Sequence, residues 1–468
     1  MTPSHSSRKT GFSWAAVIVI LMTMAAHDIT FDYWKDPHKI IFWDVLNYYA
    51  YLPAIYVHND ISLGFLDENP SLRKEQFWPH DTPTGRHVIK TTMGLAFLYA
   101  PFFWVAHPAA QMLGYPADGF SGPYRFILMF SALFYLAAGL LCLKKVLERY
   151  FSDPVVALAL VSVTLGTNLL HYSTYEATMP HSYSFSLFSM WLYLCLKWHD
   201  RPDSASSIGL GLLSGLISLI RPTNALVGIL FVLWGVTDLR SLKERALLLI
   251  KNWPLLTVIV MTAIAVWIPQ MLYWKFTAGT FWFYSYGNER FFFDRPHIIQ
   301  GLFGFRKGWL LYTPMMALAL AGIGLLYKHL REWFYPILIF TVLNVYVILS
   351  WWSWWYGGGF GLRPVIESYS ILSIPLAVLF AVALKKRTAV KAVVLTTAFI
   401  VLALNIFQTH QYRLHLIHWD GMTARAYWAV LLRLEKPDNF QELIERPDYD
   451  SARLGLKEVK GKAQSEVH

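Results

Sequence analysis

Apolar runs recur along the whole chain and are separated by short polar segments. Most of them are about 17–25 residues long, the length that a helix needs to cross a bilayer. Charged residues do not interrupt the runs at the helical period, as they would in a large soluble helical protein. The pattern predicts an all-α integral membrane protein with about eleven transmembrane helices. We place the spans near residues 12–28, 124–143, 155–171, 182–197, 206–220, 224–238, 254–275, 308–327, 333–350, 367–384 and 389–409.

The first apolar run follows Arg8-Lys9 and ends near Ala26, a pattern that signal peptides also show. Only Met24-Ala25-Ala26 resembles a cleavage site, and no clear polar start of a mature protein follows it. We therefore expect this run to remain as the first transmembrane helix. A second ambiguous run, 89–113, decides the orientation of everything after it.

Basic residues between the spans indicate the side of each loop, because short cytoplasmic loops are enriched in Lys and Arg. All basic clusters fall on the side of Arg8 and Lys9 only if 89–113 does not cross the bilayer. We therefore predict a cytoplasmic N-terminus, eleven crossings, and a re-entrant or juxtamembrane helix at 89–113 on the outer face. The clusters are Lys144, Lys145 and Arg149; Lys197 and Arg201; Arg240, Lys243, Arg245 and Lys251; Lys328 and Arg331; and Lys385, Lys386, Arg387 and Lys391.

This topology divides the chain into two parts. Residues 1–409 form a transmembrane module, in which 29–123 is a long first extracytoplasmic loop with juxtamembrane helices. Residues 410–468 form an extracytoplasmic tail, where a small interfacial helix covers the site. The end of this tail, from about Gly455, is rich in Lys and Glu, and we expect it to be disordered.

Composition agrees with a membrane protein. Of the 468 residues, 55% are hydrophobic and only 15% are charged, against roughly 25% charged in an ordinary soluble domain. The net charge of +10 comes largely from short loops that set orientation, so it does not indicate nucleic-acid binding. Cys142 and Cys195 both fall inside predicted spans, which excludes a disulfide framework or a cysteine metal motif.

The first outer loop holds a candidate for acid–base chemistry. Asp44, Tyr48 and Tyr51 are spaced at i, i+4 and i+7, which places them on one face of a helix. An acid flanked by Trp43 and Tyr48 at a membrane surface would be partly desolvated, which raises its pKa and makes it a better base. A helix cap or a surface acid has the same local sequence, so these interpretations stay open.

Two further segments bring ionisable groups to the outer edge of the membrane. Glu176 and His181 lie between two spans in a segment without Lys or Arg; such groups are functional when they face the bundle interior, and otherwise reach the interface. Arg221 follows a run of about fifteen residues, roughly 22 Å of helix, and so lies below the headgroups. It needs an anionic partner there, either Glu176 or a ligand phosphate. Pro222 ends the helix, so the next N-terminus points to the same place.

The last candidate segments combine basic residues with glycines. Arg306 and Lys307 precede a span, and the segment 354–363 reads Trp-Trp-Tyr-Gly-Gly-Gly-Phe-Gly-Leu-Arg. Its glycines let the backbone approach a ligand closely, and the fork of Arg363 suits a phosphate. Glu367 lies one turn further and could hold Arg363 in place. Trp and Tyr also gather at membrane interfaces, which does not account for the glycines.

Five segments occur in order over nearly the whole chain: Asp44-x3-Tyr48 with Tyr51-Leu52-Pro53 and Asp60; Gly94-Leu95-Ala96 with Ala100-Pro101-Phe102-Phe103 and His107; Glu176-x2-Met179-x-His181; Gly215 with Leu219-Ile220-Arg221-Pro222-Thr223-Asn224; and Trp354-Trp355-Tyr356-Gly357-Gly358 through Gly361-x-Arg363. Together they resemble the GT-C superfamily of polytopic, lipid-phosphosugar-dependent glycosyltransferases. The branch they resemble is the bacterial one described as dolichyl- or polyprenyl-phosphate-mannose mannosyltransferase-like.

The resemblance implies a GT-C-like fold with an active-site acid in the first outer loop. Family members commonly carry two adjacent acids there, whereas Val45 follows Asp44 here. Asp44 is then the expected catalytic base, with Asp60 as the alternative. The implied reaction is an inverting displacement from a polyprenyl-phosphate sugar to an acceptor hydroxyl, without metal or other cofactor. The residues expected to bind substrate or the departing phosphate are Tyr48, Glu176, His181, Arg221, Arg306, Lys307, Arg363 and Glu367.

The implied partners are a lipid-linked sugar donor, a glycan, lipid or protein acceptor, and membrane lipids, with no nucleic acid. The implied location is the bacterial cytoplasmic (inner) membrane, with the site on its extracytoplasmic face. A polymerase or ligase of polyprenyl-diphosphate-linked glycans would also use outer-face arginines. A transporter of lipid intermediates would show internal repeats and charges near mid-membrane, and neither is evident. A non-catalytic scaffold would be unaffected by loss of Asp44 and Asp60.

Overall fold

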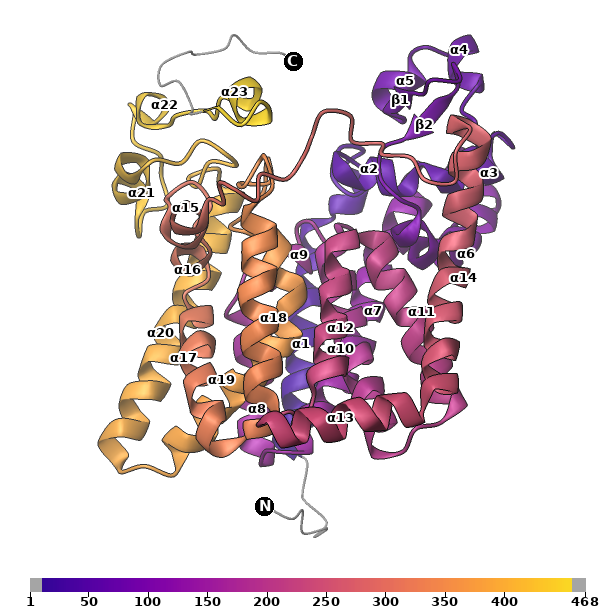
Figure 1. Ribbon diagram of the computed structural model, residues 1–468. Coiled ribbons are helices and arrows are strands. Elements are labelled where there is room, and N and C mark those ends of the chain that lie inside the picture. Colours follow the sequence, from indigo (N-terminus) through magenta and orange to yellow (C-terminus); the bar gives the residue numbers. More distant parts are fainter. Residues whose placement is uncertain (1–10, 457–468) are drawn as a thin grey trace.

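Long helices run side by side in a bundle, and shorter elements gather at one end of it (Figure 1). The structure is a computed structural model that describes residues 11–456. Six helical segments are long and apolar enough to cross a membrane, which confirms the prediction of a mostly helical membrane protein; the short hairpin of two strands was not predicted. They are α1 (Gly11–Phe31), α7 (Gly122–Glu148), α14 (Trp253–Ala278), α18 (Arg331–Leu349), η3 with α19 (Arg363–Ser368 and Tyr369–Leu384) and α20 (Thr388–Arg413).

The other predicted spans coincide with helices that are shorter or more polar, so the number eleven stays a prediction. In α10, for example, Ser182, Ser184, Ser186 and Ser189 are all buried. Helix α10 packs against α7, α11 and α19, so these serines face protein and not lipid. Ser186 and Ser189 donate their hydroxyl hydrogens to the carbonyls of Ser182 and Phe185 in the same helix. These helices are α8 (Asp153–Leu165), α10 (Pro180–Asp200), α11 (Ser204–Ile220), η2 (Pro222–Val227) with α12 (Gly228–Leu233), and α17 (Met315–His329).

Local sequence signals explain where several of these helices begin. Proline occupies the first turn of α7, α8, α10 and α14, where its missing N–H has no helical partner to lose. Asp203 caps α11 by accepting a hydrogen bond from the Ser206 amide at 2.8 Å. Asp153 of α8 accepts hydrogen bonds from the amides of Phe12 and Ser13 at 2.7 and 3.0 Å. The start of α1 is therefore tied to the start of α8.

The basic stretch 240–251, which we expected to be a loop, is helix α13 (Leu239–Lys251). Asp238 and Ser241 form a capping box at its N-terminus, which explains why a helix begins there. This helix lies across the bundle end opposite the shorter elements, and the turns that join α17 to α18 and α19 to α20 lie at that same end (Figure 1). The basic clusters of these segments thus share one end, although its assignment to the cytoplasm stays a prediction.

The other end, which we call the outer end, carries the segments predicted to be extracytoplasmic (Figure 1). Helix α6, predicted to be re-entrant or juxtamembrane, packs against α7 and α2, and its failure to cross the bilayer stays a prediction. The elements are η1 (Tyr33–Lys35), α2 (Asp44–Tyr49), α3 (Tyr51–Tyr56), α4 (Phe65–Glu68), α5 (Leu72–Glu75), β1 (Pro79–Asp81), β2 (His87–Ile89), α6 (Gly94–Met112), α9 (Leu169–Tyr172), α15 (Ile298–Phe303), α16 (Trp309–Tyr312), α21 (Ala424–Val430), α22 (Phe440–Leu443) and α23 (Tyr449–Arg453).

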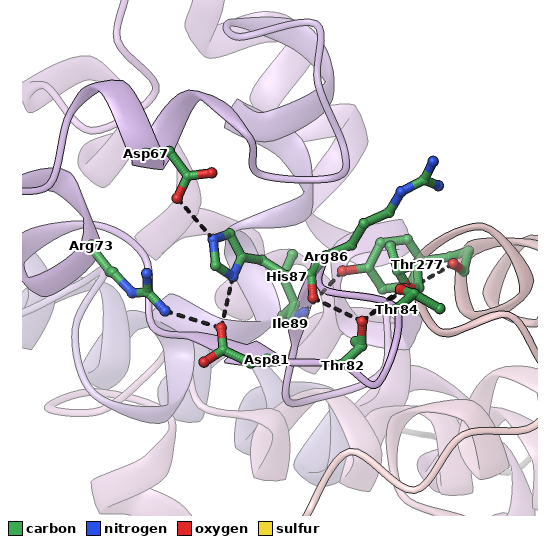
Figure 2. Close-up of polar contacts among 10 residues, drawn as sticks. Asp67, Arg73, Asp81, Thr82, Thr84, Arg86, His87, Ile89 and Thr277 are labelled. Atoms are coloured by element: carbon green, nitrogen blue, oxygen red, sulfur yellow. Dashed lines mark hydrogen bonds and ion pairs between the residues drawn. The ribbon is translucent and has the colours of Figure 1, made fainter.

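The hairpin of β1 and β2 holds the first outer loop on the end of α14 (Figure 2). Thr82 and Thr84 donate their hydroxyl hydrogens to the Thr277 carbonyl, and Arg86 donates to the Phe276 carbonyl at 2.6 Å. The last carbonyls of a helix have no partner within that helix. The hairpin supplies those partners and thereby fixes the position of the loop that contains Asp44.

Candidate functional site

A cavity of about 790 Å³ opens at the outer end of the bundle. Segments that are far apart in the sequence form its wall, namely the first outer loop, the segment after α9, the glycine segment before η3, and the tail after α20. Their side chains at the wall include carboxylates, cations and aromatic rings. The main residues are Tyr33, His38, Lys39, Trp43, Asp44, His171, Tyr175, Glu176, Gly357, Gly358, Gly359, Arg363, Tyr412, Arg413, His415, Trp419, Asp420 and Tyr449.

Asp44 and Arg363 form an ion pair in this wall. Arg363 Nη2 lies 2.7 Å from Asp44 Oδ2, and 49% of the Asp44 side chain is exposed against 11% for Arg363. The expected shielding of Asp44 is not found, because Trp43 is itself 66% exposed. The prediction that Glu367 holds Arg363 is also wrong, since Asp44 is the carboxylate paired with Arg363. A possible base and a possible phosphate ligand are therefore neighbours.

The predicted helical face of Asp44, Tyr48 and Tyr51 is interrupted, because α2 ends at Tyr49 and α3 begins at Tyr51. Both Tyr48 and Tyr51 are buried. The Tyr51 hydroxyl donates to the Thr91 carbonyl at 2.6 Å. Neither tyrosine lines the cavity, so Asp44 alone of the three faces it.

Glu367, Arg221 and His181 form a separate buried cluster behind the cavity. Glu367 Oε1 lies 3.1 Å from His181 Nδ1 and 3.4 Å from Arg221 Nη1. Glu367 is therefore the anionic partner of Arg221 in this structure, and the prediction of Glu176 in that place is wrong. None of the three residues lines the cavity. The cluster joins η3, α10 and the end of α11, which makes it a structural connection.

Glu176 faces the cavity next to the buried His171, with 3.5 Å between Glu176 Oε1 and His171 Nε2. Burial raises the pKa of Glu176, but His171, Arg363 and Lys307 outweigh burial and lower that pKa below its ordinary value. The side chain is therefore anionic at neutral pH. In that form it can accept hydrogen bonds from a hydroxyl-rich ligand but cannot act as an acid.

Lys307 and Arg306 do not line the cavity, although we predicted both as substrate ligands. Lys307 is only 1% exposed, and its Nζ donates to the carbonyls of Gly359 and Trp419. The Arg306 guanidinium lies 5.3 Å from the centre of the Trp355 ring. Burial lowers the pKa of Lys307 to about 7. Both side chains thus support the wall from behind.

Asp60, the alternative base, closes a turn outside the cavity wall. Its Oδ1 accepts a hydrogen bond from the Ser62 amide at 2.8 Å, and its Oδ2 accepts one from the Gly64 amide at 2.7 Å. Burial would raise the pKa of Asp60, but the bonds from Ser62 and Gly64 lower it. Asp60 therefore has a local structural role, because its carboxylate caps the backbone amides of this turn.

The tail contributes residues that we had not assigned to the site. Trp419 and Asp420 line the cavity, and the Tyr449 hydroxyl donates to Asp420 Oδ2 at 3.0 Å. Burial would raise the pKa of Asp420, but His418 and Tyr449 lower it. The run His418-Trp419-Asp420-Gly421 was a visible signal, yet only the fold shows that Trp419 and Asp420 line the same cavity as Arg363 and Asp44. The tail itself begins after Arg413, where α20 ends.

No group of three or more His, Cys, Asp or Glu side chains within residues 11–456 could hold a metal ion. The cations near the cavity are instead arginine and lysine side chains. The arrangement provides an acid–base group at Asp44, a guanidinium at Arg363, and carboxylates at Glu176 and Asp420. Such a cavity can accept a ligand that carries both an anionic group and hydroxyls.

No protein-family model and no curated protein sequence matches this chain. Among solved structures, the chain is similar to the oligosaccharyltransferase of Archaeoglobus fulgidus in complex with zinc and sulfate. The TM-score is 0.50 at 15% identity, with 89% of this chain and 54% of that chain covered. It is also similar to the archaeal oligosaccharyltransferase AglB of A. fulgidus, in complex with an inhibitory peptide and a dolichol-phosphate. There the TM-score is 0.50 at 12% identity, with coverage of 99% and 62%.

This chain therefore spans about half to three-fifths of the length of these neighbours. At such low identity the likeness concerns the fold alone. The chain therefore shares the fold of these oligosaccharyltransferases. The mannosyltransferase-like branch stays a prediction.

Proposed function

We propose that this chain is a membrane glycosyltransferase that moves a sugar from a polyprenyl-phosphate donor to an acceptor hydroxyl at the outer end of the bundle. The observation that carries the proposal is the 2.7 Å pair of Asp44 and Arg363 in the cavity wall. It places a group that can take a proton beside a group that can hold a phosphate. The fold shared with the oligosaccharyltransferases supports this, and one neighbour was solved with a dolichol-phosphate.

In the proposed reaction, the acceptor oxygen attacks the anomeric carbon while the bond from that carbon to the phosphate oxygen breaks. Asp44 takes the proton of the acceptor hydroxyl. Polyprenyl phosphate leaves with the bonding electrons, and Arg363 stabilises its developing charge. Because a single displacement occurs, the anomeric configuration inverts. Glu176 and Asp420 accept hydrogen bonds from sugar hydroxyls.

The ion pair also suggests an order of binding. The Arg363 side chain is 11% exposed, so a donor phosphate that binds it must compete with Asp44. When the phosphate takes over the guanidinium, the Asp44 carboxylate becomes available as a base. Donor binding would thus precede activation of the acceptor.

The finer assignments rest on the sequence resemblance. It supports a hexosyl or pentosyl donor, a location in the bacterial cytoplasmic membrane, and an acceptor that is a glycan, a lipid or a protein. The apolar surface beside the spans suits the polyprenyl tail of the donor.

The test is release of polyprenyl phosphate by the full chain in lipid, measured over a panel of polyprenyl-phosphate sugars with and without chelator. We expect Asp44→Asn to lower the rate by about 10²–10⁴-fold, as loss of a general base does. Arg363→Ala should lower it by about 10²–10³-fold. Asp60→Asn and Arg240→Ala are matched controls outside the cavity, and both should retain activity.

The possible failures point to different alternatives. Normal release by Asp44→Asn would remove Asp44 from the chemistry, and loss of release by Asp60→Asn alone would move the base to Asp60. Release from diphosphate donors only would favour a polymerase or ligase of diphosphate-linked glycans. Movement of an intact lipid-linked sugar across the bilayer, without release, would favour a transporter. A loss of release with chelator would contradict the metal-independent reaction.

A further inference from the structure

A buried lysine joins two parts of the cavity wall that are far apart in the sequence. Lys307 Nζ donates to the Gly359 carbonyl of the glycine segment and to the Trp419 carbonyl of the tail. Gly359 and Trp419 both line the cavity, whereas Lys307 does not. We propose that Lys307 is a positioning residue that holds the tail segment 416–421 closed over the cavity. Its catalytic consequence rests on the proposed function.

The burial of Lys307 argues against a direct role at the phosphate. The residue is 1% exposed, and two of its three N–H groups already have backbone acceptors. The charged groups that act on it are Asp420 and Glu176, which attract it, and Arg363 and Arg306, which repel it. An ammonium group is rarely buried without a specific partner set. Here that set consists of the two wall segments.

The geometry of the glycine segment fits this role. Gly359 has a φ of +145°, and a Cβ at this position would lie 2.5 Å from the Tyr172 hydroxyl oxygen. The Phe360 amide donates a hydrogen bond to that same hydroxyl oxygen at 3.0 Å, which fixes the orientation of the peptide unit between Gly359 and Phe360. The Gly359 carbonyl is therefore held in one direction, and Lys307 binds it there.

The tail is built in the same way. His418 Nδ1 accepts a hydrogen bond from the Gly421 amide at 2.9 Å, which closes a turn that contains Trp419. Asp420 is held by Tyr449, and Leu416 and Ile417 are buried in a separate small core with Phe360. The turn is thus a preformed unit, and Lys307 attaches this unit to the glycine segment.

Loss of the two hydrogen bonds from Lys307 should make the tail segment 416–421 more mobile. It would leave Asp44 and Arg363, the groups proposed to act in the reaction, in the chain. We expect weaker binding of the donor or acceptor and therefore a higher KM, while kcat changes little. The same loss should expose the amides of 416–421 and 357–361 to solvent more often.

The experiment compares the full chain in lipid with Lys307→Met, which keeps the stem and removes the donors, and with Lys307→Gln, which keeps an amide donor. Lys436→Met, on the exposed face of the same tail, is the control. Hydrogen–deuterium exchange of 416–421 should accelerate by about tenfold or more in Lys307→Met, because the two buried hydrogen bonds to the wall carbonyls are lost. In Lys307→Gln, exchange of 416–421 should be faster than in the wild type and slower than in Lys307→Met. Exchange in α7 and α19 should not change in either variant. The KM should rise in parallel.

Unchanged exchange at 416–421 in Lys307→Met would overturn the inference. A collapse of kcat with unchanged KM and unchanged exchange would instead assign Lys307 to the chemistry and would also overturn it. Exchange does not require turnover. If the wild-type chain releases no polyprenyl phosphate, the proposed function fails, and the exchange result still decides whether Lys307 holds the tail.

Discussion

The substitution Glu367→Gln tests whether the buried cluster behind the cavity holds the bundle together. Glu367 is 2% exposed and lies between the Arg221 guanidinium and the His181 ring. Glutamine has nearly the same shape and can still bond His181, but it is neutral. The change therefore removes the counter-charge of Arg221 while it leaves the packing in place.

The size of the effect follows from the geometry. Two unit charges at the 3.4 Å of this pair attract each other by about 5 kcal/mol at an effective dielectric constant of about 20. Removing one partner of a buried pair costs about 3–5 kcal/mol, because the remaining charge is left without compensation. Arg221 keeps 19% of its side-chain exposure, which allows some solvation. We therefore expect Glu367→Gln to lower the free energy of unfolding by about 3 kcal/mol.

The assay is reversible unfolding by SDS in mixed micelles, with the single variants Glu367→Gln and Arg221→Met and the double variant. The double variant should lose less than the sum of the two single variants, because it removes both charges together. The control Glu244→Gln breaks an exposed pair with Arg240 at 3.0 Å, and it should cost less than about 1 kcal/mol. If Glu367→Gln resembles this control, or if the single effects add fully, the cluster is not a coupled ion pair and the reasoning is refuted.

Three further predictions concern the outer end. The double substitution Thr82→Val and Thr84→Val removes the hydroxyl hydrogen bonds to the Thr277 carbonyl, and it should destabilise the hairpin by about 1–3 kcal/mol; unchanged hydrogen exchange of 79–89 would contradict this. Gly359→Ala should abolish polyprenyl-phosphate release with the bundle still folded by circular dichroism, because the new Cβ meets the Tyr172 hydroxyl, and full activity would show that the segment adapts. Burial lowers the pKa of Lys307 to about 7, so the closed tail binds fewer protons than the open tail between pH 7 and the ordinary lysine pKa. The closed position of the tail should thus become more stable as pH rises above about 7 in the wild type but not in Lys307→Met. The measurement is hydrogen exchange of 416–421, corrected for the intrinsic pH dependence of amide exchange. Weaker protection of these amides at higher pH would disprove the prediction.

Parts of the site could be predicted because their chemistry is visible in short segments. The glycine segment and Arg363, together with Asp44 and Glu176, were assigned to one outer-face site. The structure brings Arg363, Asp44, Glu176 and the three glycines of 357–359 to one cavity, whereas Gly361 does not line it. Lys307 was assigned to the same site but lies behind its wall. Its sequence context, a lysine beside Arg306 and Gly308, does not reveal whether the ammonium points to a ligand or to two carbonyls.

The sequence by itself determined the membrane character and the position of the long spans. The predicted span 254–275 became α14 (Trp253–Ala278), and 389–409 became α20 (Thr388–Arg413). This works because the free energy of moving a helix into lipid is nearly a sum over its own residues. The basic segment 240–251 was placed correctly between spans, but its capping box made it a helix.

Only the tertiary structure decided which charges are partners. Arg363 pairs with Asp44 across 319 positions of the chain, and Arg221 pairs with Glu367 across 146, whereas neighbours in sequence suggested Glu367 for Arg363. An ion pair depends on distance and burial after the helices have packed, and neither quantity is a property of a local segment. The tail reaches the cavity for the same reason, because its turn is held there by Lys307 from a distant part of the chain.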